Sequence, residues 1–124
     1  MPKVTNELVR KYGPIINKIP DTSLKDMEEI LEYFYNFNSG LQKELYHEYK
    51  NTSIESTYLM PLMHETNSEE GRMINHLRNY YHYLKEDKRR ADEIRKKFFT
   101  NFSAFLLHLK SLEVFYNYVY KKEA

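Results

Sequence analysis

The sequence predicts an all-α protein, a four-helix-type bundle whose second and last helices are long. Two long segments carry apolar residues at alternating steps of three and four, which is the spacing of one buried helix face. The 124 residues include only three glycines, all isolated, and no segment shows the alternating pattern of a strand. A chain of this length is expected to form one domain, so we expect a single helical domain over residues 1–124.

The first long helix is expected over residues 22–50. Asp21, Thr22 and Ser23 supply short oxygen-bearing side chains that can cap its first turn. Its apolar stripe keeps the same phase on both sides of Gly40, and a glycine inside a helix costs only about 1 kcal/mol. We therefore favour one continuous helix over two helices broken at Gly40. The stripe consists of Leu24, Met27, Leu31, Phe34, Leu41 and Leu45, with Asn38 at the one position that is not apolar.

The last helix is expected over residues 87–121 and carries a second apolar stripe. Phe99, Leu106 and Phe115 widen this stripe into a band that faces a core, rather than a narrow coiled-coil seam. The stripe itself consists of Ala91, Ile94, Phe98, Phe102, Phe105, Leu109, Leu112, Tyr116 and Val119.

Two shorter helices complete the expected bundle. One lies over residues 5–18, where Pro14 introduces a kink or a stop. The other is expected over residues 68–86, with Ser68 as its cap. Between the long helix and this one, residues 51–67 mix capping residues with an apolar patch, and we expect a loop with a short helix there. The face of the third helix consists of Met73, Leu77, Tyr80 and Leu84.

The composition excludes several functional classes. Without cysteine, the chain forms no disulfide scaffold, thiolate zinc site, iron–sulfur cluster or cysteine nucleophile. Its isolated glycines make no phosphate-binding loop, and its net charge of +1 excludes a globally basic nucleic-acid binder while leaving room for a local patch. No apolar run reaches the length of a membrane span and residues 1–7 lack a signal-peptide core. We expect a cytoplasmic protein without membrane contact and without a cofactor.

Tyrosines are the most conspicuous residue type, with twelve of them beside seven phenylalanines. One stripe cannot bury consecutive aromatic residues, because neighbouring positions point about 100° apart around a helix. Some tyrosines therefore either fill a wide core and leave their hydroxyls at its rim, or face a protein partner or a second copy of the chain. The candidates for such a partner surface are Tyr33, Tyr35, Tyr118 and Tyr120.

Arg78 and His82 form a candidate catalytic pair. They lie four residues apart on a helix, on a face turned away from its apolar stripe. A guanidinium can hold a phosphate while an imidazole acts as acid or base near neutral pH, which suits phosphodiester chemistry. The alternative is an exposed, solvated helix face.

A metal site is not expected. Glu44 and His47 supply one Glu-x-x-His pair, whereas a di-iron bundle needs such a pair on each of two helices and single glutamates from two others. The remaining histidines show no recognisable ligand spacing.

A basic cluster lies around the start of the last helix. Seven cations in thirteen positions can contact a phosphate backbone, and this RNA contact is a possible second function. Acidic residues are interleaved at the spacing of ordinary helix ion pairs, so a solvated helix face is the alternative. The candidate nucleic-acid-binding residues are Lys85, Lys88, Arg89, Arg90, Arg95, Lys96 and Lys97.

Three local resemblances follow from these segments. Arg78 and Asn79, followed by His82, resemble the HEPN superfamily motif of an Arg, a polar residue and a His, with three residues between Arg and His here and four to six in the family. Residues 77–85 and 94–107 resemble abortive-infection phage-resistance proteins of the AbiC type. The length and the aromatic-rich last helix are also similar to the small helical subunit of type III CRISPR effector complexes.

These resemblances imply functions that the composition alone does not. The HEPN resemblance implies a metal-independent RNase that acts as a dimer, with Arg78 as phosphate clamp and His82 as acid or base. The abortive-infection resemblance implies a prokaryotic phage-defence or mobile-element system, and the CRISPR resemblance implies an RNA-contacting subunit. We expect a small non-enzymatic interaction protein of such a system, acting by self-association or partner binding, with the HEPN-like endoribonuclease and the RNA-contacting subunit as alternatives.

Overall fold

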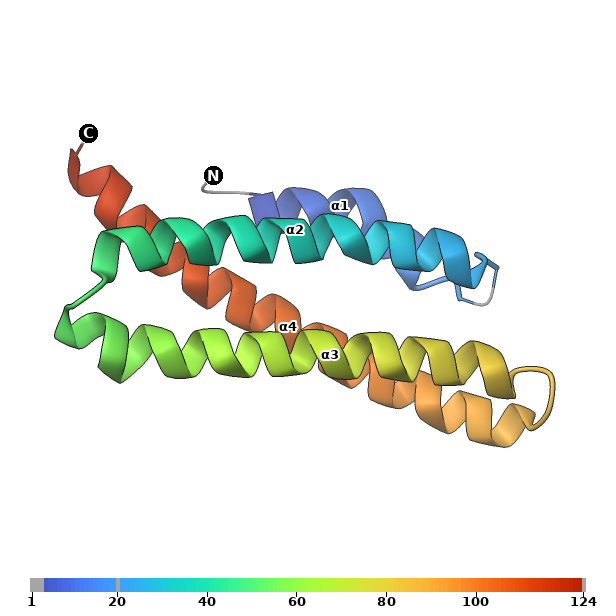
Figure 1. Cartoon of the computed structure of the whole chain (residues 1–124). Helices are drawn as coiled ribbons and strands as arrows, with labels where there is room; N and C mark the ends of the chain where they lie inside the picture. Colours follow the sequence, from blue (N-terminus) through green and yellow to red (C-terminus); the bar gives the residue numbers. More distant parts are fainter. Residues whose placement is uncertain (1–3, 20, 124) are drawn as a thin grey trace.

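The structure, a computed structural model, describes residues 4–19 and 21–123, and this part of the chain forms four α-helices and no strand. α2, α3 and α4 run in alternating directions, α4 crosses behind the other two, and α1 lies along α2 on the side away from α3 (Figure 1). The prediction of an all-α bundle with long second and last helices is confirmed. The elements are α1 (Val4–Ile16), α2 (Leu24–Tyr49), the π-helical turn η1 (Glu55–Leu59), α3 (Met60–Tyr83) and α4 (Lys88–Glu123).

The core lies where α4 packs against α2 and α3. Phe34 of α2 meets Phe102 of α4 edge to face, with ring centroids 5.5 Å apart, and Phe102 stacks on Phe98 at 6.1 Å. The predicted stripes of α2 and α4 are buried, apart from half-buried Leu24 and Tyr116. The side chain of Val119 lies outside the described residues. Periodicity therefore identified the core faces of the two long helices.

α2 is one continuous helix, as the unchanged phase of its stripe predicted. It runs through Gly40 without interruption. The hydroxyl oxygen of Ser23 accepts a hydrogen bond from the backbone N–H of Asp26 at 3.2 Å, so Ser23 is the cap among the three candidates. At the start of α4, the carboxylate of Asp87 likewise accepts from the N–H of Arg90 at 3.2 Å.

The loop expected over residues 51–67 is largely helical, which corrects the sequence-based expectation. η1 leads directly into α3, which begins at Met60. Pro61 does not prevent this, because it lies in the first turn of α3, where a helix needs no N–H donor. Leu59 and Met63 are buried and anchor this early part of the helix in the core.

Ser68 is not a helix cap, contrary to the prediction. Its hydroxyl donates to the carbonyl of His64 at 3.0 Å within α3. The sequence did not predict the early turns of α3, because two of the stripe positions in these turns carry polar residues. These residues are Thr66 and Glu69, and both are buried. Polar residues at core positions remove the periodic signal on which the prediction depended.

α1 is attached to the bundle by aromatic, apolar and polar contacts, and its Ile16 is fully buried in the core. Pro14 does not stop it, and Tyr12 stacks on Tyr33 of α2 with centroids 5.0 Å apart and planes 11° from parallel. The buried carboxylate of Glu113 in α4 accepts hydrogen bonds from the backbone N–H of Thr5, at 2.8 Å, and from its hydroxyl. A carboxylate at this end of α1 satisfies an N–H that has no partner within the helix.

None of the helices, within the residues described, is long and apolar enough to cross a membrane.

A substitution at Gly40 tests the continuity of α2 in solution. A Cβ at this position has no neighbouring atom within 4 Å, so alanine fits without strain. We expect Gly40→Ala to raise the free energy of unfolding by about 0.5–1 kcal/mol, because alanine favours a helix interior over glycine. Urea denaturation followed by circular dichroism measures the change.

The matched control is Asn51→Ala, at a residue whose φ of 65° is in the left-handed region. Alanine there is expected to lower the stability. A loss of stability in Gly40→Ala would show instead that α2 is broken at Gly40.

Candidate functional site

The proposed catalytic pair on α3 is divided between two different acidic partners. Arg78 extends toward α2, where its Nε lies 3.2 Å from Oε1 of Glu28. Nε2 of His82 lies 3.6 Å from Oε2 of Glu86. Both side chains are exposed, and no contact joins the guanidinium to the imidazole within the described part of the chain. The catalytic role of the pair stays a prediction.

The predicted basic cluster is distributed over different sides of α4. Arg90 and Lys97 line a groove between α3 and α4, whereas Arg95 and Lys96 line a separate hollow beside Phe99. A helix turns by about 100° per residue, so neighbouring cations of one segment face different surroundings. The remaining members, Lys85, Lys88 and Arg89, are exposed around the start of α4.

The four tyrosines proposed for a partner surface also lie in different places. Tyr33 and Tyr118 are exposed. Tyr35 is half-buried: its hydroxyl is buried, with no hydrogen-bond partner among the described residues, and burial raises its pKa. The reason is its position on the side of α2 that faces α3 and Phe105, 6.1 Å from Tyr35 between ring centroids. The side chain of Tyr120 lies outside the described residues.

A groove runs between α2 and α3. It consists of two hollows of about 580 and 290 Å³, and Tyr35 lines both. Tyr46 and Met60 are 55% and 49% exposed and stand beside the larger hollow. We call the groove together with these flanking residues the α2–α3 face. Sequence analysis did not single out Tyr46 or Met60, because nothing in their spacing separates them from residues of a core.

Polar side chains bridge this groove. Asn38 of α2 donates to Oδ1 of Asn67 at 3.1 Å and to Oε2 of Glu70 at 2.9 Å, both on α3. The amides of Gln42 and Asn67 exchange hydrogen bonds of 2.9 and 3.2 Å. Burial raises the pKa of Glu70, and the Asn38 bond opposes this effect. The polar position in the α2 stripe is therefore a contact with α3.

Exposed charges of opposite sign lie at the two ends of the α2–α3 face. Lys43 lines the larger hollow, together with His64. Glu29 and Glu32 line the smaller one. The other charged groups of the smaller hollow are Lys25 and the paired Glu28 and Arg78.

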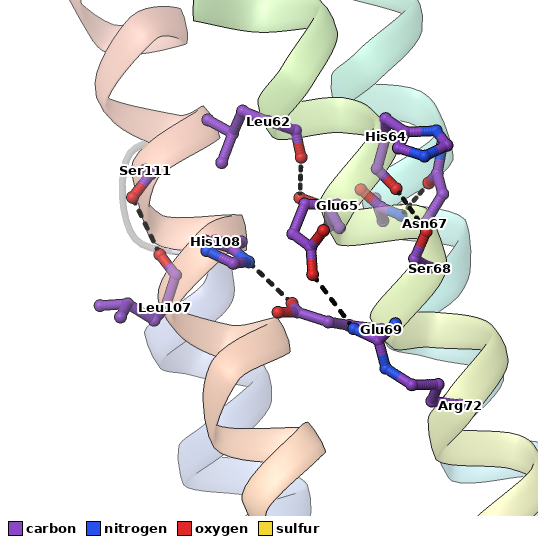
Figure 2. A network of polar contacts seen from close by, with 12 residues as sticks. Leu62, His64, Glu65, Asn67, Ser68, Glu69, Arg72, Leu107, His108 and Ser111 are labelled. Atoms are coloured by element: carbon purple, nitrogen blue, oxygen red, sulfur yellow. Dashed lines mark hydrogen bonds and ion pairs between the residues drawn. The ribbon is translucent and has the colours of Figure 1, made fainter.

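A series of side-chain hydrogen bonds and ion pairs lies on the side of α3 that faces α4. Figure 2 shows His108 pointing from α4 to Glu69, with Nδ1 and Oε2 2.7 Å apart. Glu69 is only 4% exposed, so its carboxylate needs this partner. Beside it, Glu65 pairs with Arg72 at 3.1 Å on the exposed surface of α3. Sequence reasoning missed the Glu69–His108 pair because 39 residues separate its members.

Asn101 of α4 continues this series. When its amide is oriented to satisfy both of its polar atoms, the oxygen accepts from Nε of Arg72 at 3.2 Å and the nitrogen donates to Nε2 of His76 at 3.1 Å. Burial, followed by the nearby charges of Lys97 and Arg72, lowers the pKa of His76. Since Nε2 accepts a bond, the neutral ring carries its proton on Nδ1.

Between the C-terminal part of α3 and the N-terminal part of α4 lies a groove of about 420 Å³, which we call the hairpin groove. The guanidinium of Arg90 lies 4.3 Å from the ring centroid of Tyr83 at one side of it. The groove is lined by His76, Asn79, Tyr83, Arg90, Glu93, Ile94 and Lys97.

The described residues contain no group of three or more histidine, aspartate or glutamate side chains that is placed to hold a metal ion. Glu44 and His47 are exposed on α2.

Comparisons with protein-family models, with curated proteins and with solved structures find no match to this chain. The resemblances to HEPN proteins, to abortive-infection proteins and to the CRISPR subunit stay predictions. Function is therefore inferred from the geometry of the α2–α3 face and of the hairpin groove.

Removing the partner of Glu69 is expected to destabilise the protein. His108→Leu leaves a carboxylate that is 4% exposed without its hydrogen bond, and we expect a loss of about 1–3 kcal/mol in the free energy of unfolding. The double variant Glu69→Leu/His108→Leu should recover most of this loss, because it buries no charge. Urea denaturation measures both.

The control for this pair is Glu65→Gln, which breaks the exposed ion pair with Arg72 and should cost less than about 1 kcal/mol. An equal loss in His108→Leu and Glu65→Gln would contradict the role assigned to the Glu69–His108 pair.

The lowered pKa of His76 predicts a loss of stability on acidification. The folded state binds fewer protons at His76 than the unfolded state at pH values between the folded pKa and the ordinary value of 6.5. The free energy of unfolding therefore falls as the pH drops below 6.5. We expect His76→Gln, which cannot titrate, to lose less stability than the unmodified protein between about pH 7 and pH 5.

Urea denaturation at several pH values measures this difference. Asn75→Gln, at an exposed residue of the same helix that carries no titratable group, is the control and should follow the pH profile of the unmodified protein. Parallel pH profiles for the unmodified protein and His76→Gln would contradict the prediction.

Proposed function

We propose that this protein is a helical interaction protein that pairs with a second copy of itself through the α2–α3 face. The observation that supports this function best is the separation of exposed charges along the face, with Lys43 at one end and Glu29 and Glu32 at the other. The proposed biological setting, a prokaryotic phage-defence or mobile-element system, rests on the abortive-infection resemblance alone.

The charge pattern fits a symmetric, antiparallel pair. A two-fold axis that lies in the contact plane and crosses the groove near Tyr35 lays α2 against α2 of the second copy. Tyr35 is close to midway between Lys43 and Glu29 along the helix. Lys43 of each copy then faces Glu29 and Glu32 of the other, so the contact forms twice.

The α2–α3 face also offers apolar area and room for close approach. Tyr46 and Met60 are about half exposed, and residues of these types are favoured at protein interfaces. Gly71 is exposed on α3, one helical turn after Asn67 of the larger hollow, and no atom lies within 4 Å of its missing Cβ. Two copies of α3 can approach closely at that point.

The area of the face is sufficient for a moderate affinity. From Lys25 to Tyr46, α2 extends about 30 Å, and two adjacent helices are about 20 Å wide. These dimensions correspond to roughly 600 Å² per copy, or roughly 1,200 Å² in total, which is the lower end of specific interfaces. A concentration-dependent dimer is therefore expected.

Charge reversal provides a sharp test. Lys43→Glu and the double variant Glu29→Lys/Glu32→Lys each place like charges opposite one another in the symmetric pair. We expect each variant alone to dimerise at least about tenfold more weakly than the unmodified protein, because like charges that face each other oppose association. An equimolar mixture of the two should regain association, because both contacts of the mixed pair then join opposite charges. Sedimentation equilibrium measures all three samples.

The matched control is Lys110→Glu, at an exposed position of α4 outside the α2–α3 face, which should dimerise normally. Circular dichroism establishes that each variant is folded. A monomeric unmodified protein, or a mixture that associates no better than its separate components, would refute the proposed pairing.

A further inference from the structure

The hairpin groove gathers hydrogen-bond donors and positive charge from two helices. Arg90 and Lys97 project from α4, and His76 and Asn79 from α3. Glu93 is the carboxylate of this groove, and its Oε1 lies 3.9 Å from Nε of Arg89. The lining therefore carries more positive charge than negative, although the whole chain is nearly neutral.

Two of these donors are held in place by neighbouring side chains. The ring of Tyr83 lies against the guanidinium of Arg90 at 4.3 Å, which restricts the motion of an otherwise exposed arginine. Asn101 holds the ring of His76 through a 3.1 Å bond and is itself bound to Arg72 at 3.2 Å. A site whose donors are already oriented loses less entropy when a ligand binds.

The chemistry of the groove suits an anion with several oxygen atoms. A guanidinium can donate two parallel bonds to a phosphate, and an ammonium adds a compact charge. The Asn101 contact leaves the Nδ1–H of His76 as a further donor, and Asn79 supplies an amide. The volume of about 420 Å³ lies within the range of small-ligand sites.

We propose that the hairpin groove binds a phosphate group through Arg90, Lys97 and His76, with Asn79 as an additional donor. The phosphate belongs either to the backbone of single-stranded RNA or to a free nucleotide, since both present the same anionic oxygens. Of the seven cations in the basic cluster, this site uses only Arg90 and Lys97. The proposal does not depend on self-association, because other residues line the α2–α3 face.

The test compares two charge-matched variants. Arg90→Gln/Lys97→Gln removes both cations of the groove, and Lys88→Gln/Lys96→Gln removes two exposed cations of the same segment that do not line it. Binding of a fluorescent uridine oligonucleotide of about twelve residues is followed by anisotropy, and binding of uridine monophosphate by calorimetry. Circular dichroism checks that both variants are folded.

We expect the groove variant to bind at least about tenfold more weakly, and the control variant less than about threefold more weakly. For the oligonucleotide, the slope of log K against log salt should become shallower by about 1.4 in the groove variant, because two phosphate contacts are lost. Binding of the oligonucleotide alone assigns the site to RNA, and binding of uridine monophosphate assigns it to a nucleotide.

Two results would overturn the proposal. One is equal weakening in both variants, which would indicate diffuse attraction to the whole basic segment. The other is the absence of binding to either probe by the unmodified protein. Since dimerisation is measured separately by sedimentation, failure of this site and failure of the α2–α3 pairing are distinguishable.

Discussion

The packing of α4 against both α2 and α3 is the constraint on which the rest of the molecule depends. Phe98 and Phe102 of α4 form a continuous aromatic contact with Phe34 of α2, and the same helix reaches α3 through the Glu69–His108 pair. Across the groove between them, α2 and α3 are bridged by side-chain hydrogen bonds and by the Glu28–Arg78 ion pair. Because α4 crosses behind the pair, the opposite side of α2 and α3 remains available as a groove (Figure 1).

Buried polar residues define how the helices align. Asn38, Glu69 and Glu113 are almost completely buried, and each bonds to a different helix from its own. A displacement of one helix along another would leave these groups without partners, at a cost of about 1–3 kcal/mol each. Several alignments of the helices would bury similar apolar area. We interpret these three polar residues as the ones that favour the observed alignment.

The polar edges of α3 give the molecule its two candidate binding surfaces. The edge toward α2 carries Asn67 and Glu70 and forms a wall of the α2–α3 face, whose exposed charges are separated along its length. The edge toward α4 carries His76 and Tyr83 and forms a wall of the hairpin groove. Arg78 and His82, the predicted catalytic pair, contact two different acidic partners. The possible function of each polar side chain on α3 therefore depends on which residues the adjacent segments place beside it.

The sequence by itself determined the helical class, the core stripes of α2 and α4, the Ser23 cap and the continuity of α2 through Gly40. These features depend on local spacing and backbone preference, which are properties of one segment at a time. Only the tertiary structure decided the early start of α3, the burial of the Tyr35 hydroxyl and the separation of Arg90 and Lys97 from Arg95 and Lys96. The physical reason is that a polar side chain can occupy a core or groove position only when another helix supplies its partner. The spacing of residues within one helix does not identify that partner.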